Sequence, residues 1–147
     1  MSRSTNNATS TALVLPPQYS TRLFRSSWLT AFSVYSAAQY DLWICCSMTL
    51  LVLLTSLNYW RHPIHGWRRN MDISAVFFGF AYHIYRSLWC ASSSHQVVYY
   101  GFVLKTLYCY SQARAAPNKD VSSRWHMTMH LVGNIGNLVL YAGGLSL

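Results

Sequence analysis

Apolar residues gather into four long runs along the chain, separated by short polar segments. The clearest run covers about residues 42–60, holds no charged residue over 19 positions and ends in Tyr59 and Trp60. An α-helix of about 20 apolar residues crosses the hydrocarbon core of a bilayer. The three further runs lie at about 72–90, 95–113 and 125–145. The pattern predicts an all-α, polytopic membrane protein with about four transmembrane helices in a bundle.

The segment before these runs is polar. Residues 1–26 are rich in Ser, Thr and Asn and contain the breaker Pro16-Pro17, so we expect a mobile tail. Residues 27–40 mix aromatic residues with Ser and Gln and are too short and polar to cross a bilayer. An interfacial helix fits them better. The expected organisation is therefore a tail over 1–40 and a transmembrane domain over 41–147.

The chain is basic, with 11 Lys and Arg, 3 Asp and no Glu, giving a net charge of +8. The basic residues flank the apolar runs and accompany no groove-reading motif, which indicates a membrane surface rather than nucleic acid. Loops 61–71 and 113–124 hold six of them and would share one face. The positive-inside rule puts this face in the cytosol or the mitochondrial matrix, with both termini opposite.

Two interpretations of the tail compete. Arg3, Arg22 and Arg25 without any acid resemble a mitochondrial targeting segment, whereas Asn7-Ala8-Thr9 is a glycosylation sequon of the secretory pathway. The mitochondrial inner membrane and an endomembrane both remain open. The cysteines, Cys45, Cys46, Cys90 and Cys109, form no Cys-x-x-Cys pair and lie in apolar stretches. We interpret them as buried thiols.

Histidines and one aspartate are the best lead to chemistry. His62 follows the first run, Asp72 begins the second, and His126 and His130 begin the fourth, so all four approach the basic face. His126 and His130 are four residues apart and share one helix face, a common way to hold one metal ion. Polar residues continue this face, and similar faces occur on the first two runs, so we expect the three to point inward.

A concrete site follows from this convergence. His62, His126 and His130 would hold zinc and leave one position open for water, as in catalytic zinc sites. Asp72 would orient a histidine or accept the water's proton, and Ser56 and Asn58 would donate hydrogen bonds to an oxyanion. His83 and Arg86 lie too far along the second helix from Asp72 to share this site, and the role of Lys105 in the third run stays open.

Simpler roles exist for each residue. His62 can be an interfacial histidine, and His126 and His130 can hydrogen-bond across helices without metal. Asp72 can pair with Arg68 or Arg69, or cap its helix.

The same residues resemble a motif set of the membrane hydrolase superfamily that includes alkaline ceramidases and the progestin and adipoQ receptors. That set has Ser and His at the end of one span, Asp about ten residues later, and His-x-x-x-His in the last span. Ser56, His62, Asp72, His126 and His130 are the matching positions, although Asn58 stands where the family has its Ser. The resemblance implies a zinc-dependent enzyme that hydrolyses amide bonds in lipids.

Three hypotheses remain. The first is a metal-dependent membrane hydrolase acting on a lipid. The second is a non-enzymatic accessory subunit of a larger membrane complex, for example a respiratory one, which would bind lipids and other membrane subunits. The third is a haem or chlorophyll protein with histidine ligands. Bound zinc, co-purified chains and a Soret band distinguish them.

Overall fold

The computed structural model describes residues 13–145 and consists of α-helices, without a β-strand in that part of the chain. The all-α prediction is confirmed. The six helices are α1 (Pro17–Ser27), α2 (Thr30–Gln39), α3 (Trp43–Trp60), α4 (Trp67–Ser87), α5 (Ser93–Ala115) and α6 (Lys119–Ala142).

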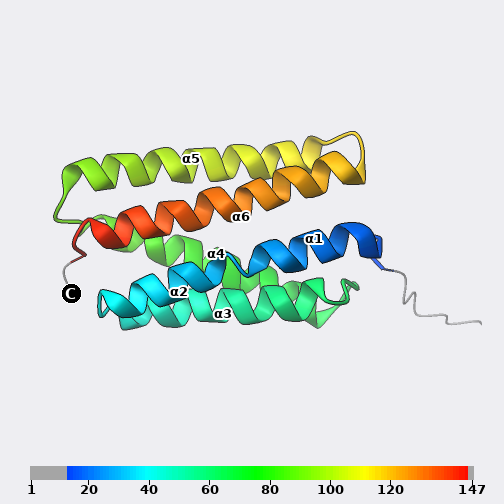
Figure 1. Ribbon diagram of the computed structural model, residues 1–147, viewed down its shortest axis with the longest axis horizontal. Coiled ribbons are helices and arrows are strands. Elements are labelled where there is room, and N and C mark those ends of the chain that lie inside the picture. The colour runs from blue at the N-terminus through cyan, green and yellow to red at the C-terminus, as the bar shows by residue number, and fades with distance from the viewer. Residues whose placement is uncertain (1–12, 146–147) are drawn as a thin grey trace, which may run out of the picture.

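The helices run along the long axis of the molecule (Figure 1). α1 and α2 lie in line, and each later helix reverses direction. α5 packs against α6, and α6 also packs against α1 and α2. On their other side, α1 and α2 pack against α3, which in turn packs against α4. Residues 17–142 therefore make five helical passes between the two ends of the bundle.

Helices occupy all four predicted apolar runs. α3 matches 42–60 closely, while α4, α5 and α6 begin two to six residues before the predicted runs. Polar caps explain these early starts, because the Ser92 side chain accepts from the His95 amide and the Asn118 side chain from the Val121 amide. Gly66, at φ 140°, precedes α4 in a conformation that favours glycine.

The tail expected over residues 1–26 is wrong for residues 17–26, which form most of α1; residues 1–12 lie outside the described part. Nor is 27–40 a separate surface helix, since Trp28 and Leu29 keep helical dihedrals and join α1 to α2. The buried positions recur every three or four residues through both helices. This small-residue stripe comprises Ser20, Leu23, Ser26, Ser27, Thr30, Ser33 and Ala37.

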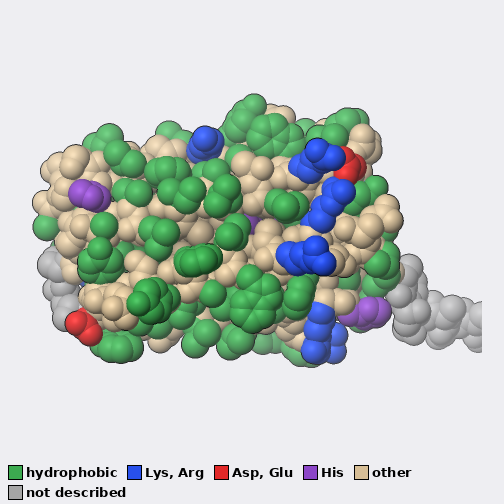
Figure 2. Space-filling view, in the orientation of Figure 1, with side chains coloured by type: hydrophobic (Ala, Val, Ile, Leu, Met, Phe, Trp, Pro, Cys, Tyr) green, Lys and Arg blue, Asp and Glu red, His purple; other side chains and the backbone are tan. Residues whose placement is uncertain are grey.

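The two ends of the bundle differ in charge (Figure 2). At one end of the bundle α1, α4 and α6 begin and α3 and α5 finish (Figure 1). We refer to this end as the basic end. Loops 61–71 and 113–124 both lie there, as predicted. The Val14 amide donates to the Pro63 carbonyl at 2.8 Å, so the described chain starts at this end, whereas Leu145 pairs with Cys90 at the far end. The prediction that both termini share the opposite face does not hold for the described residues.

The core of this bundle is mixed, and fifteen hydrophobic residues are buried in it among residues 13–145. Twelve polar or charged residues are buried while 26 large hydrophobic residues are exposed among residues 13–145. α2 shows exposed apolar residues beside a buried polar one: Phe32 and Tyr35 are 64% and 66% exposed, whereas Ser33 is 0% exposed. Apolar side chains are accordingly spread over the whole of the visible face (Figure 2).

By length and composition, one of the described helices, α3, is suited to cross a membrane. α4, α5 and α6 are long enough but contain Arg, Lys, His or Asn residues, many of which lie in their first or last turns or face other helices. The length and apolarity of α3 are weak support for membrane insertion when taken alone.

Candidate functional site

Asp72 lies buried between α3 and α4, with 7% of its surface exposed. The Ser56 hydroxyl donates to Asp72 Oδ1 at 2.5 Å, and Thr55 Oγ1 donates to the same atom at 3.4 Å. The structure thus brings together Ser56 and Asp72, two predicted site residues from different helices. Arg68 and Arg69 form no ion pair with Asp72 in the described structure.

His126 and His130 lie one turn apart on α6, with their ring centroids 4.9 Å apart. His130 Nδ1 is 2.8 Å from Ser26 Oγ on α1, and that hydroxyl donates to the Leu23 carbonyl. We therefore assign the Nδ1 hydrogen as the donor to Ser26, which leaves the Nε2 lone pair of His130 available. His126 contacts the edge of the Trp60 ring, 5.3 Å away between centroids.

His62 does not join this pair. It is exposed in the turn after α3, and Trp60, two residues earlier, occupies the space against His126. Asn58 is half-buried and lies about 200° around the helix from Ser56, because each residue turns an α-helix by about 100°. Among residues 13–145 no three His, Cys, Asp or Glu side chains are grouped closely enough to hold a metal ion.

The residues present therefore fit the predicted three-histidine zinc site only in part. Two imidazoles are adjacent, and Ser26 orients one of them in the way that metal ligands are oriented by outer hydrogen bonds. The third predicted ligand faces the surface, and Asp72 accepts from hydroxyls rather than from a histidine.

Further towards the far end, His83 is 3% exposed and joins α4 to α6. Its Nδ1 lies 2.6 Å from the Gly79 carbonyl, which can only accept, so Nδ1 carries the hydrogen. The Tyr141 hydroxyl then donates to Nε2 at 2.6 Å. Tyr141 is the partner that the sequence did not identify for His83.

Asn134 holds α2 against α6. Ser33 Oγ donates to its Oδ1 at 2.6 Å, and its Nδ2 donates to the Thr30 hydroxyl and to the His130 carbonyl. The small-residue stripe on α1 and α2 thus supplies partners for the polar face of α6. Its spacing of three and four residues is the signal in the sequence that could have found it, but a search for apolar periodicity misses a stripe made mainly of Ser and Thr.

At the basic end, one acidic residue links two helices. Arg22 on α1 and Arg124 on α6 both form ion pairs with Asp120 in the first turn of α6. The hydrogen bond from Arg22 lowers the pKa of the Asp120 carboxyl below its ordinary value. All three side chains are partly exposed, so salt will screen these pairs.

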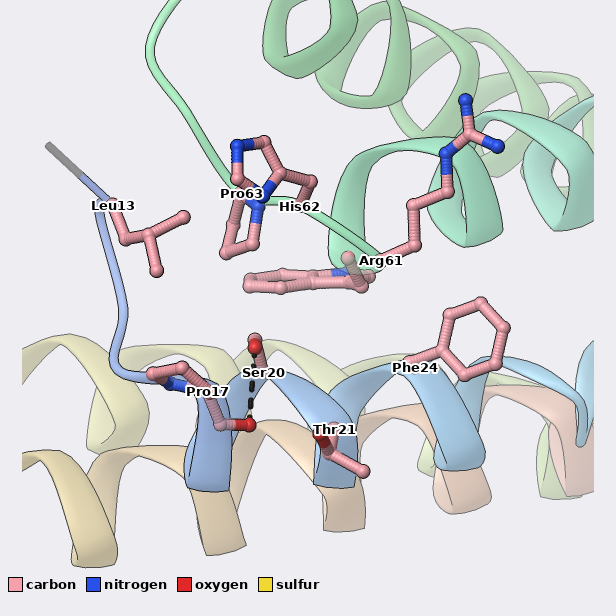
Figure 3. Close-up of a pocket in the computed structure, with 9 residues that line it drawn as sticks. Leu13, Pro17, Ser20, Thr21, Phe24, Arg61, His62 and Pro63 are labelled. Carbon is pink, nitrogen blue, oxygen red and sulfur yellow. Dashed lines mark hydrogen bonds between the residues drawn. The ribbon is translucent and has the colours of Figure 1, made fainter. Parts of the chain in front are cut away.

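A pocket of about 280 Å³ lies at the basic end, between α1 and the turn that follows α3. Ser20 on α1 faces His62 and Pro63 across it, and Thr21 lies at its edge (Figure 3). The remaining lining residues are Leu13, Pro17, Phe24, Trp60 and Arg61. The pocket combines an apolar wall with a polar edge.

The chain matches none of the family models, curated proteins or solved structures with which it was compared. The resemblance to the ceramidase and adipoQ receptor superfamily stays a prediction. A functional proposal therefore rests on the geometry of the buried polar groups.

Proposed function

We propose that this protein is an integral membrane protein that crosses its bilayer five times and serves as a non-catalytic accessory subunit of a membrane complex. The large hydrophobic residues exposed on the bundle, together with the polar residues buried inside it, are the observation that supports membrane insertion. Exposed Phe32 and Tyr35 beside buried Ser33 would be unfavourable in water, where large apolar side chains favour the interior. In lipid the same arrangement satisfies the polar groups internally.

The lengths of the five passes fit a bilayer. α3 has 18 residues and α6 has 24, so at about 1.5 Å per residue they span roughly 27–36 Å. The hydrocarbon core is about 30 Å thick. Positive charges gathered at one end of the bundle agree with a single basic membrane face.

The accessory role is supported by what the buried polar groups do. Ser56 bonds to Asp72, Ser33 to Asn134 and Tyr141 to His83, and each bond joins two different helices. Such pairs hold helices together where the hydrophobic effect between them is absent. Large side chains on α4 and α5 remain exposed for lipids or partner helices.

Membrane extraction and purification test this proposal. We expect membranes washed with alkaline carbonate to retain the chain, and gentle detergent purification to recover other chains in a fixed ratio to it. Release by carbonate would overturn the membrane proposal. A protein that stays in the membrane and purifies without any partner would overturn the accessory role alone.

A metal-dependent lipid hydrolase is the second candidate. It is favoured by two polar groups at the same end of the bundle, the adjacent His126 and His130 and the Ser56–Asp72 hydrogen bond. Trp60, one turn after Ser56 on α3, contacts His126, so the two groups lie at similar depth.

Metal analysis separates the two candidates. A hydrolase of this kind would contain about one zinc per chain when purified without chelator, lost in His126→Ala and His130→Ala and kept in His65→Ala. His65 is a matched control because it is an exposed loop histidine. Wild-type protein without zinc would contradict the hydrolase.

A further inference from the structure

We propose that the basic end selects anionic phospholipids from the surrounding leaflet, and that the pocket between α1 and the turn after α3 binds one of them. This inference rests on the proposed membrane function and names the class of lipid that the protein prefers.

The charge at the basic end is one-sided. Of the ten basic residues in the described part of the chain, eight lie there: Arg22, Arg25, Arg61, Arg68, Arg69, Arg114, Lys119 and Arg124. The acids nearby are Asp72, which is buried against Ser56, and Asp120, which already pairs with Arg22 and Arg124. Six cations therefore have no carboxylate partner among residues 13–145. Lipid phosphates are the complementary charge available at a membrane surface.

Tryptophans mark the depth at which these cations lie. Trp67 is 62% exposed, and Arg68 lies over its ring at 5.7 Å from the centroid. Trp60 lines the pocket, and Trp125, on α6, contacts Tyr108. Tryptophan is enriched at the level of lipid headgroups, so this end of the bundle would meet the phosphates rather than the bulk solvent.

The pocket has the chemistry of a lipid site. Phe24, Trp60 and Leu13 give it an apolar wall that suits an acyl chain, while Thr21 and Arg61 offer donors to a phosphate and its glycerol. In Figure 3 the Arg61 side chain extends from the turn on the side away from Leu13. A free phosphate would use the polar edge alone, whereas a phospholipid uses both parts. The amphipathic lining therefore favours the lipid.

Native mass spectrometry of the detergent-solubilised full chain tests the selection. With equal amounts of phosphatidylglycerol and phosphatidylcholine, we expect phosphatidylglycerol adducts to dominate. Arg61→Gln should lower their ratio roughly fivefold, the typical effect of one basic residue near an anionic surface. Lys105→Gln removes the same charge from the middle of α5 and should leave the ratio unchanged. Equal losses in both variants would overturn selection by the basic end.

A second variant tests the pocket itself. Ser20→Phe extends a large side chain from α1 into the cavity without changing charge, and it should reduce phosphatidylglycerol adducts as strongly as Arg61→Gln. Unchanged binding would show that the pocket is not the lipid site. If a variant fails to fold, wild-type protein suffices, because higher ammonium acetate should lower the ratio by screening. A ratio that is independent of salt would overturn the proposal.

The two proposals fail in different ways. A chain that resists carbonate extraction but binds both lipids equally contradicts the lipid selection and leaves membrane insertion intact. A chain that carbonate releases contradicts the membrane proposal on which the inference rests.

Discussion

Single hydroxyl groups join neighbouring helices of this bundle, and Ser56 is the clearest case. Its hydroxyl lies 2.5 Å from the buried Asp72, whose other side-chain partner, Thr55, is at 3.4 Å. When a buried carboxyl loses its main hydrogen-bond donor, the remaining hydrogen bonds no longer offset the free-energy cost of its desolvation. The stability of the α3–α4 pair should therefore depend on this one hydroxyl.

Ser56→Ala should lower the free energy of unfolding by about 0.5–2 kcal/mol. The measurement is thermal or denaturant unfolding in a mild detergent. Ser47→Ala is the matched control, because Ser47 is exposed on the same helix and its hydroxyl donates to the Trp43 carbonyl of its own helix. That change should cost less than about 0.5 kcal/mol. Equal effects of the two substitutions would contradict the role of the Ser56–Asp72 bond.

Residue positions near the helix ends are the hardest to predict. The sequence predicts that His62 lies within reach of His126. That contact requires the chain after α3 to turn towards the interior of the bundle. In the structure Trp60 fills that space and His62 turns to the surface. The direction of a side chain after a helix end depends on how the turn packs, and no periodic pattern encodes it. The proximity of Ser56 to Asp72 is easier to predict, because both residues lie within regular helices.

Close helix packing depends on one glycine of α6. A Cβ added at Gly136 would lie 2.9 Å from Phe102 Cβ of α5, whereas one at Gly133 would lie 3.7 Å from Thr106. Gly136→Ala must push the two helices apart, at about 1–3 kcal/mol, more than the ~1 kcal/mol gained in helix propensity. We expect it to lower the unfolding midpoint.

Gly133→Ala is the matched control, since it adds the same methyl group to the same helix at ordinary contact distance. It should leave the midpoint unchanged or raise it slightly. If Gly133→Ala proved as destabilising as Gly136→Ala, the especially close approach of α5 to α6 at Gly136 would be contradicted.

The contact between α1 and α6 should depend on pH. Because Arg22 lowers the pKa of Asp120 in the folded state, the carboxylate stabilises folding above its unfolded pKa, near 4. This contribution should be lost as pH falls through the lower folded pKa. The expected result is that wild type has a higher unfolding midpoint than Asp120→Asn at pH 6 and that the difference shrinks and disappears as the pH falls through the lowered folded pKa.

Unfolding midpoints of both proteins across this pH range, at low and moderate salt, measure the effect. Salt should reduce it because the ion pair is partly exposed. A difference between the two proteins that is the same at every pH would exclude the Arg22–Asp120 pair as its source.

At the scale of elements, apolar runs locate four helices to within six residues of their observed bounds. α1 escapes this criterion because Ser20, Ser26 and Ser27 occupy much of its buried face, and polar residues ordinarily predict exposure to solvent. In lipid, small hydroxyl residues suit helix contacts because they allow close approach of the backbones. Ser20 and Ser27 satisfy their own hydroxyls by donating to carbonyls of α1.

At the scale of the whole molecule, adding the α1–α2 pass changes the topology. Four passes would put both termini on one side of a membrane, whereas five put residue 13 at the basic end and residue 145 at the far end. Whether the number of passes is even or odd thus depends on recognising the serine-rich helix α1, which forms the first pass together with α2.

Protease protection of tags at the two ends of the chain tests this topology most directly. In sealed vesicles of one orientation, one tag should be digested and the other protected, and detergent should expose both. The positive-inside rule expects the tag nearer the basic end to lie on the cytosolic or matrix side. Two tags that are digested or protected together would contradict five passes and, with them, the assignment of α1 and α2 as one membrane-crossing unit.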